Sequence, residues 1–286
     1  MTQRRSVVVT GVSTGIGWAT AQVLIAKGFH VFGSVRKAAD AQRLRDAFGA
    51  AFTPMVFDVT DEVAVRAAAR KVETDLKGAP LAGLVNNAGI AVAGPLLYLA
   101  IDEFRQQLDV NLTGVVIATQ AFAPLLGAQS PTIQTPGRIV NISSVGGKNA
   151  NPFMGPYCAT KFGLEGLSES LRRELLPFGV DVVIIAPGAV ATPIWDKAEA
   201  VDVARYANTV YAPALERMRA FMLSLGKSGL PPETIGEAVH LALTTPKPKT
   251  RYVLSPDPFQ VFMTGILPKR TLDRIVGKRL GLLPEG

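Results

Sequence analysis

The octapeptide Thr10-Gly11-Val12-Ser13-Thr14-Gly15-Ile16-Gly17 connects a short β-branched run, Ser6–Thr10, to a helical pattern that contains Ala19 and Val23. Glycines here permit a tight turn and a close approach to a ligand, and the helix N-terminus offers unpaired N–H groups and a positive dipole to phosphates. The glycine spacing alone is weak evidence, but its place between a strand and a helix makes it specific for a dinucleotide. The residues expected to line that cofactor are Gly11, Ser13, Thr14, Gly15, Ile16 and Gly17.

Strand and helix patterns alternate along the rest of the chain. Short apolar runs typical of buried parallel strands occur at 6–10, 30–35, 53–57, 81–85, 138–142, 180–186 and 251–255. The helical patterns between them imply right-handed βαβ crossovers. We therefore expect a single α/β domain over residues 1–286, with a Rossmann-type doubly wound sheet of about seven parallel strands and helices on both faces.

The segment 188–230 breaks this alternation. It carries Trp195, Tyr206 and Tyr211 among charged residues. This mixture suits a helical substrate lid over the carboxyl edge of the sheet, and it suits equally well an extra helical pair packed on the core.

The C-terminal extension 256–286 holds much of the net charge of +7. From Lys269 onward, five basic residues stand against two acidic ones, and the preceding run 259–267 is apolar. Such a run is usually a solvated helix face, but it also fits a weak peripheral contact with an anionic membrane surface. Because no run of eighteen apolar residues occurs, we expect no transmembrane span.

Composition excludes several other classes. Cys158 is the only cysteine, so no intrachain disulfide can form, and with only His30 and His240 beside it we expect no metal site. The N-terminus has no signal-peptide pattern, which indicates a cytoplasmic protein. Neither a zinc finger nor a long basic helix is present, so no nucleic acid partner is expected.

The end of the second strand indicates which dinucleotide binds. An acidic residue there would accept hydrogen bonds from the ribose hydroxyls of NAD, but this chain has Val35-Arg36-Lys37. A guanidinium pairs with a 2′-phosphate through charge-assisted hydrogen bonds. We interpret Arg36 as the phosphate ligand, with Ser13 and Lys37 as helpers, and predict NADP(H); the alternative is a solvated Arg-Lys pair.

Tyr157 and Lys161 stand four residues apart at the start of a helical pattern, on one face. A free tyrosine has a pKa of about 10 and is a poor base at neutral pH, but a nearby ammonium favours the phenolate. Ser144 lies just beyond the fifth strand, where it can hold a substrate oxygen. Asn111, inside the helical pattern 101–126, can bend that helix and bind a water.

These features recur together in one family. The ordered set, over about residues 5–192, is the glycine loop, Asn86-Asn87-Ala88-Gly89, Asn111, Ser143-Ser144, Tyr157 with Lys161, and Pro187-Gly188-Ala189-Val190-Ala191-Thr192. It resembles the short-chain dehydrogenase/reductase family. The resemblance implies hydride transfer between nicotinamide and a carbonyl or alcohol, in a homodimer or homotetramer.

The same resemblance implies a role for each matching residue. Tyr157 is the acid/base, Lys161 binds the nicotinamide ribose and tunes Tyr157, and Ser144 polarises the carbonyl. Asn111 holds a proton-relay water. The further residues implied to contact the cofactor are Asp58 and Val59 at the adenine, Asn87, Ala88 and Gly89 along the cofactor, Tyr157, Lys161, Pro187 and Gly188, and Thr192 at the carboxamide.

A narrower set of motifs, 144–147, 151–153, 157–167 and 175–179, is similar to the estradiol 17-beta-dehydrogenase and retinol dehydrogenase branch. That branch implies a lipophilic alcohol, ketone or aldehyde (a steroid, retinoid or similar) and usually NADP(H). The chain departs from it after Thr192, where the steroid-contacting lid has no convincing match.

Two other functions are weighed against this one. A 3-oxoacyl-thioester reductase usually ends soon after its last strand, whereas this chain continues about thirty residues past Ser255. A non-catalytic nucleotide-sensing protein would typically lack the tyrosine or the lysine, and both are present. We therefore rank the lipophilic oxidoreductase first, the acyl reductase second and the sensor third.

Overall fold

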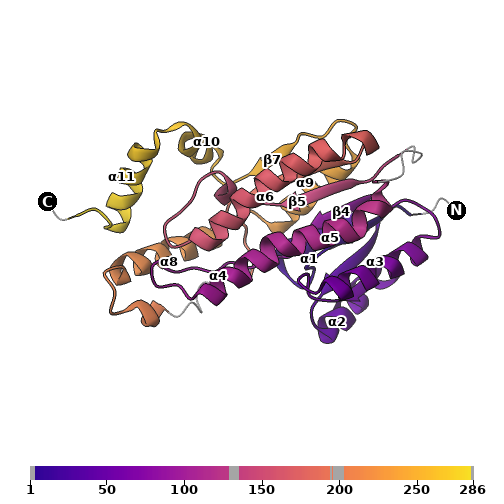
Figure 1. Ribbon diagram of the computed structural model, residues 1–286, viewed down its shortest axis with the longest axis horizontal. Helices are drawn as coiled ribbons and strands as arrows, with labels where there is room; N and C mark the ends of the chain where they lie inside the picture. The colour runs from indigo at the N-terminus through magenta and orange to yellow at the C-terminus, as the bar shows by residue number, and fades with distance from the viewer. Residues whose placement is uncertain (1–3, 129–134, 194, 196–202, 285–286) are drawn as a thin grey trace.

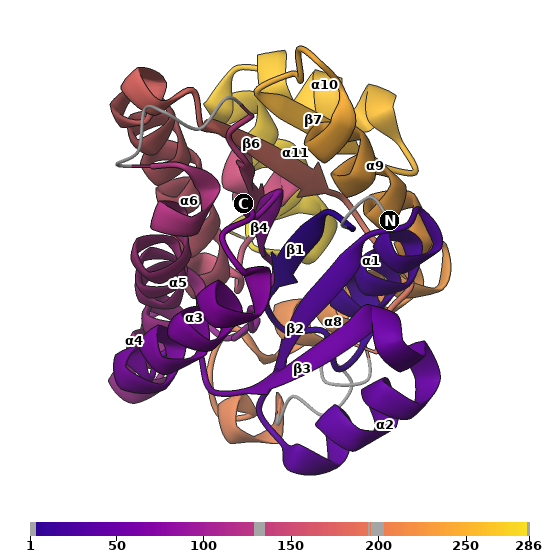
Figure 2. The same cartoon turned by 90° about the vertical axis from the view of Figure 1, so that its right-hand side faces the viewer.

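Seven parallel strands form one sheet in the order β3-β2-β1-β4-β5-β6-β7 (Figures 1 and 2). The computed structural model describes residues 4–128, 135–193, 195 and 203–284. The strands are β1 (Ser6–Val9), β2 (His30–Val35), β3 (Phe52–Val56), β4 (Gly83–Asn86), β5 (Arg138–Ile142), β6 (Asp181–Pro187) and β7 (Arg251–Leu254). The longer helices are α1 (Gly15–Ala26), α2 (Ala38–Phe48), α3 (Glu62–Leu76), α4 (Ile101–Leu108), α5 (Gly114–Phe122), α6 (Gly155–Glu174), α8 (Ala212–Lys227), α9 (Pro232–Thr244), α10 (Pro258–Ile266) and α11 (Lys269–Leu280).

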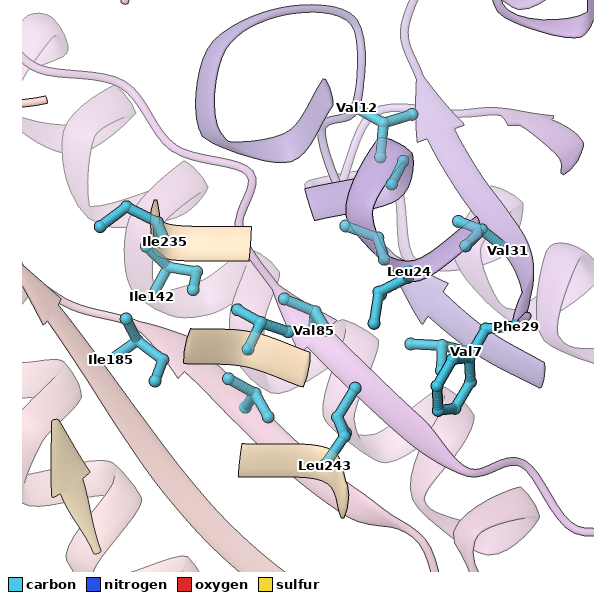
Figure 3. Close-up of a cluster of buried hydrophobic side chains, with 14 of the residues drawn as sticks. Val7, Val12, Leu24, Phe29, Val31, Val85, Ile142, Ile185, Ile235 and Leu243 are labelled. Carbon is cyan, nitrogen blue, oxygen red and sulfur yellow. The ribbon is translucent and has the colours of Figure 1, made fainter. Parts of the chain in front are cut away.

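Helices cover both faces of the sheet. Figure 2 shows α1, α2 and α9 on one side and α3, α4, α5 and α6 on the other. All four residues of β1 are buried, because both faces of a parallel sheet are covered. One core surrounds Val7 and Leu24 (Figure 3), and the other surrounds Val8 and Phe122. The predicted doubly wound α/β fold is confirmed.

The reversal of strand order places the site. Strand β1 has β2 on one side and β4 on the other, so the chain turns in opposite directions on the two sides of β1. In doubly wound proteins, the loops that follow such strands separate at the carboxyl ends and leave a crevice in which ligands bind.

Five of the seven strands differ from their predicted bounds by one or two residues, and only 30–35 and 138–142 agree at both ends. The fourth begins at Gly83 rather than 81, because the Leu81 amide donates to the Leu125 carbonyl outside the sheet. The third ends at Val56 rather than 57. Terminal residues of an element depend on single hydrogen bonds, which an apolar pattern does not specify.

The helical stretch Ile101–Leu126 would be long and apolar enough to cross a membrane, with a mean hydropathy of 1.3. In the fold it packs against α3, α6 and β4, and it buries Gln107 and Asn111. It is therefore a core helix of the α/β fold. Its middle, Asp109–Thr113, forms a π-helical turn.

Helices α8, α10 and α11 lie at one end of the molecule, away from α2 and α3 (Figure 1). Helices α8 and α11 share an apolar cluster that contains Tyr206, Met218 and Leu280. The predicted lid, 188–230, is helical over α8, while residues 194 and 196–202 lie outside the described part of the chain.

Candidate active site

The glycine loop is packed tightly against the segment that follows β4. A Cβ on Gly17 would lie 2.5 Å from Asn87 Nδ2 and closer still to the Gly11 carbonyl oxygen, so only glycine fits there. Gly11 has a φ of +70° and faces the Ala88 backbone. Asn87 Nδ2 donates to the carbonyl oxygens of Thr10 and Gly11, each at 2.9 Å. The backbone of the loop is therefore held by the Asn87 side chain and by close packing against Ala88.

Thr10 completes this connection. Its Oγ1 accepts hydrogen bonds from the amides of Asn87 and Ala88, each at 3.0 Å. Helix α1 begins at Gly15, and its N-cap residue Thr14 makes no side-chain capping bond. The N–H groups of the first turn are thus not capped by that side chain, which suits a phosphate.

Arg36 and Lys37 are both exposed directly after β2. Among the described residues, none forms a hydrogen bond or an ion pair with Arg36. A second cation, Arg43 of α2, donates from Nη2 to the Ser13 carbonyl oxygen at 2.7 Å and pairs with Asp40. The region around the end of β2 is therefore cationic. The sequence pattern does not single out Arg43, because its contact with Ser13 spans thirty residues.

Asp58 and Val59 follow β3 at the same edge of the sheet. The Asp58 carboxylate accepts from the amide and the hydroxyl of Thr60, at 3.0 and 2.8 Å. Val59 is buried against Gly114 at the start of α5. Both residues are thus fixed by contacts close to the end of β3 and at the start of α5.

The π-helical turn directs Asn111 inward. Its Oδ1 accepts from the Ile90 amide at 2.9 Å, and its Nδ2 donates to the Ile90 carbonyl oxygen at 3.0 Å and to Thr160 Oγ1 at 3.2 Å. Asn111 therefore joins the segment after β4 to α6. The helix is locally irregular where the sequence predicts a bend, since Asp109–Thr113 is π-helical, and Gly89 lies against the Asn111 side chain.

Gln107 supports the same segment from one turn earlier. Its amide nitrogen donates to the Ile90 carbonyl oxygen at 2.9 Å and its amide oxygen accepts from Val92 N at 2.7 Å. The pattern-based site residues do not include Gln107, although its spacing of four from Asn111 places both on one helix face.

Ser144, Tyr157 and Lys161 come together where β5 meets α6. Ser144 Oγ accepts from Gly146 N at 3.0 Å and hydrogen-bonds with the Tyr157 side chain. Lys161 Nζ donates to the Ile142 carbonyl oxygen at 2.8 Å and lies 5.6 Å from the centre of the Tyr157 ring. The sequence-predicted triad is thus one contiguous group.

Burial sets the protonation of this group. It raises the pKa of the Tyr157 phenol, and the hydrogen bond with Ser144 opposes that change. The expected lowering of the tyrosine pKa by the lysine is wrong for the protein without cofactor, because desolvation dominates. Burial also lowers the pKa of Lys161 to about 8, with the Glu165 carboxylate acting in the opposite direction. Tyr157 is a neutral phenol at neutral pH and can donate a proton.

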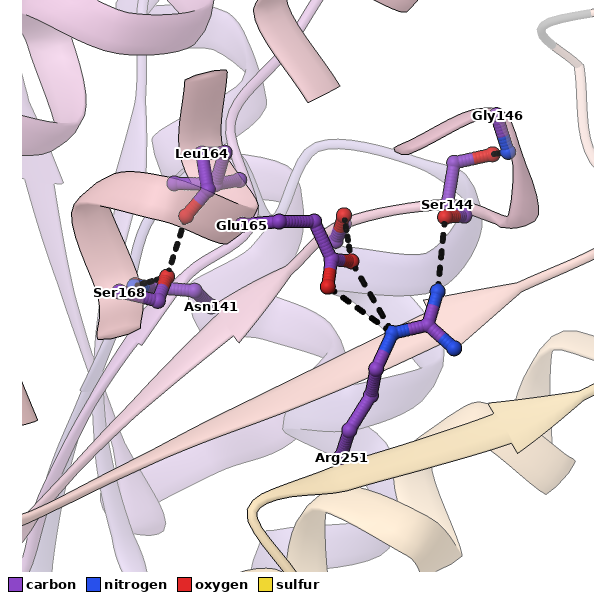
Figure 4. Close-up of polar contacts among 8 residues, drawn as sticks. Asn141, Ser144, Gly146, Leu164, Glu165, Ser168 and Arg251 are labelled. Atoms are coloured by element: carbon purple, nitrogen blue, oxygen red, sulfur yellow. Dashed lines mark hydrogen bonds and ion pairs between the residues drawn. The ribbon is translucent and has the colours of Figure 1, made fainter. Parts of the chain in front are cut away.

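A partly buried ion pair supports this triad (Figure 4). Arg251 Nε at the start of β7 lies 2.9 Å from Glu165 Oε2, and its Nη2 donates to the Ser144 carbonyl oxygen at 3.4 Å. Glu165 also accepts from Ser143 Oγ at 2.8 Å. Because Glu165 lies one helical turn beyond Lys161, a helical pattern in the sequence can indicate that the two side chains are close. Arg251 lies 86 residues away, so no local pattern joins it to Glu165.

The segment after β6 returns over the glycine loop. Pro187 ends that strand, and the Gly188 amide donates to the Leu254 carbonyl oxygen at 2.7 Å. A Cβ on Gly15 would meet the Thr192 side chain at 3.3 Å. Three predicted stretches thus meet at one edge of the sheet: the glycine loop, residues 87–89 after β4, and residues 187–192 after β6.

This edge combines a glycine loop suited to phosphates with the neutral phenol of Tyr157, the hydroxyl of Ser144 and the buried ammonium of Lys161. Such a set fits a dinucleotide laid across the carboxyl ends of the strands. It fits acid–base chemistry on an oxygen next to that dinucleotide.

Comparison with known proteins agrees with this geometry. The family model for short chain dehydrogenase matches residues 5–202. The chain is a short-chain dehydrogenase. It is an oxidoreductase that acts on CH–OH groups, and its family binds a nicotinamide cofactor.

This short-chain dehydrogenase is similar to several named relatives. An NADPH-dependent 3-dehydrocapnine reductase from Ornithobacterium rhinotracheale is 39% identical over 283 residues, covering 98% of this chain and 99% of the relative. Human retinol dehydrogenase 5 is 34% identical, over 86% of this chain and 79% of the relative. A short-chain dehydrogenase structure from Streptomyces avermitilis has a TM-score of 0.74 at 27% identity, over 97% and 95% of the two chains. The expected retinol dehydrogenase relative is confirmed.

Proposed function

We propose that this short-chain dehydrogenase uses NADP(H) to interconvert a lipophilic ketone or aldehyde and its alcohol. The observation that carries the chemistry is the contiguous group of Ser144, Tyr157 and Lys161 beside the glycine loop. The preference for NADP(H) rests on the exposed Arg36-Lys37 at the end of β2, where NAD enzymes place an acid. A relative named for its dependence on NADPH supports that preference.

In the reductive direction, a nicotinamide cofactor held by the glycine loop and Lys161 would supply the hydride that the carbonyl carbon accepts. Tyr157 donates its phenolic proton to the carbonyl oxygen, and Ser144 stabilises the negative charge that develops there. The Lys161 ammonium stabilises the phenolate that remains. Asn111 holds Thr160, whose hydroxyl donates to the Tyr157 carbonyl oxygen at 2.7 Å, and so fixes the first turn of α6.

An apolar cluster that includes a residue just before α6 supports a lipophilic substrate. Phe153 lies four residues before Tyr157, and its ring packs 5.8 Å from the Tyr211 ring of the predicted lid. Both belong to the cluster that contains Met218 of α8. The substrate of one relative, retinol dehydrogenase 5, is itself a lipophilic alcohol.

The proposal is tested by following NADPH oxidation against steroid ketones, retinal, acyl thioesters and small dicarbonyls, with NADH in parallel. We expect turnover of one lipophilic class, faster with NADPH than with NADH. Turnover of acyl thioesters alone would favour the alternative of a 3-oxoacyl reductase, which a structure of that name with 28% identity also suggests. Tight NADPH binding without turnover of any carbonyl would contradict the proposal and favour a nucleotide sensor.

Glu165→Gln is expected to shift the alkaline limb of the kcat profile to lower pH. The Glu165 carboxylate favours the Lys161 ammonium, so its removal lowers the lysine pKa below its value of about 8, and the ammonium is lost at lower pH. The unpaired Arg251 guanidinium acts in the same direction. The measurement is kcat against pH, with each variant normalised to its own maximum.

The matched control is Glu169→Gln, the same change one turn further along α6, where the carboxylate is exposed and paired with Arg173. Its profile should superimpose on that of the unmodified protein. An identical alkaline limb in Glu165→Gln would show that Glu165 does not tune Lys161.

A further inference from the structure

Helix α10 is an apolar surface helix. Its sequence, Pro-Phe-Gln-Val-Phe-Met-Thr-Gly-Ile, has no charged residue, and none of its residues is buried. Phe259, Phe262 and Ile266 are 72%, 61% and 59% exposed. Their spacing of three and four residues places them on one face of the helix. A soluble surface rarely leaves such a stripe uncovered without a partner for it.

Helix α11 follows after two residues and is basic. Arg270, Arg274 and Lys278 are exposed and recur every four residues, so they share one face. The other side of α11 packs on α8, because Leu280 is buried in the shared cluster and the Arg279 guanidinium lies 4.0 Å from the centre of the Phe221 ring. The basic face is therefore held outward by packing.

An exposed apolar stripe can be covered by a second copy of the chain or by a lipid surface. The charge around the stripe distinguishes between the two. A second copy of the chain would meet this surface with the same surface, since a two-fold interface joins identical patches. That contact would bring two sets of exposed arginines and lysines together in a protein of net charge +7. An anionic lipid surface offers the opposite charge together with an apolar interior.

We propose that α10 and the basic face of α11 dock on an anionic lipid bilayer. Phe259, Phe262 and Ile266 enter the interface, and Arg270, Arg274 and Lys278 contact the lipid headgroups. Figure 1 shows that both helices lie at the end of the molecule that contains α8. The docked surface thus lies on the side of the predicted lid. This proposal does not depend on which carbonyl the enzyme reduces.

The test is sedimentation of the full chain with vesicles, either pure phosphatidylcholine or an equal mixture with phosphatidylglycerol, with no substrate present. We expect binding to the anionic vesicles only, falling steeply as salt is raised from about 0.1 M to about 0.5 M. Arg270→Gln/Arg274→Gln/Lys278→Gln should bind about a hundredfold more weakly. Phe259→Ser/Phe262→Ser should bind at least about tenfold more weakly.

The matched control removes three exposed basic residues of α3 at the opposite end of the molecule, Arg66→Gln/Arg70→Gln/Lys71→Gln, and should bind vesicles as the unmodified chain does. Absence of vesicle binding by the unmodified chain would overturn the proposal, as would equal losses in the α3 and α11 variants. Light scattering tests whether a second copy covers the stripe instead. If the unmodified chain binds no vesicles and Phe259→Ser/Phe262→Ser has fewer subunits than the unmodified chain, the stripe is assigned to a second copy. If a variant does not fold, the salt dependence of vesicle binding by the unmodified chain still tests whether the contact is electrostatic.

Discussion

Tyr157→Phe is expected to lower kcat by about 10²- to 10⁴-fold while leaving NADPH binding nearly unchanged. The change removes only the phenolic oxygen, which is the proton donor in the proposed reduction. The aromatic ring remains at the start of α6, so the packing against Gly146 and the position of Lys161 are preserved. The measurements are steady-state NADPH oxidation and NADPH binding by fluorescence.

Tyr252→Phe is the matched control. It also removes one phenolic hydroxyl, which accepts from the Lys249 amide at 3.1 Å, and it lies on β7 outside the proposed machinery. Its kcat should stay near that of the unmodified enzyme. Retained turnover in Tyr157→Phe would contradict the proposed proton donor, and loss of NADPH binding would mean that the variant reports on the cofactor site instead.

Arg36→Asp is expected to change the ratio of kcat/KM for NADPH over NADH by about 10²-fold or more in favour of NADH. A hydrogen bond to a charged group contributes about 1.5–3 kcal/mol, which is about one to two factors of ten. A carboxylate at this position adds repulsion of the 2′-phosphate and can accept from the ribose hydroxyls of NADH. The measurement is the kinetics of both cofactors with one carbonyl substrate.

Arg45→Asp provides the same change of charge on α2, at an exposed arginine that donates to Gln42. The cofactor ratio of this control should remain within about twofold of the unmodified value, because exposed charges at a distance are screened. An unchanged ratio in Arg36→Asp would remove Arg36 from phosphate recognition. Arg43, which bonds the Ser13 carbonyl oxygen, would then be the cation to test.

Local patterns predict the fold and the central residues of the site well, because each depends on neighbours in sequence. The glycine loop sits between β1 and α1, and Tyr157 and Lys161 share one turn of α6. Asn111 is recognisable as a polar residue inside an apolar helix, and the structure has a π-helical turn there.

Contacts between distant segments account for what the sequence does not predict. The pairing of Glu165 with Arg251 depends on β7 lying beside β6, and the pKa of Tyr157 depends on how much of the fold surrounds it. The lid segment has no single periodicity, and its composition alone left a lid and a packed helical pair equally open. The packing of α8 on α11 depends on residues about sixty positions apart, such as Met218 and Leu280.

The ion pair between β7 and α6 also bears on the order in which a newly made chain becomes active. A growing chain that ends before Arg251 already contains the glycine loop, Tyr157 and Lys161, yet Glu165 lacks its cation. Arg251 is the first residue of β7, so the pair forms only after β7 has joined the sheet beside β6. The contacts of Arg251 with Glu165 and with the Ser144 carbonyl oxygen thus link the completion of the sheet to the final position of the Ser144 loop.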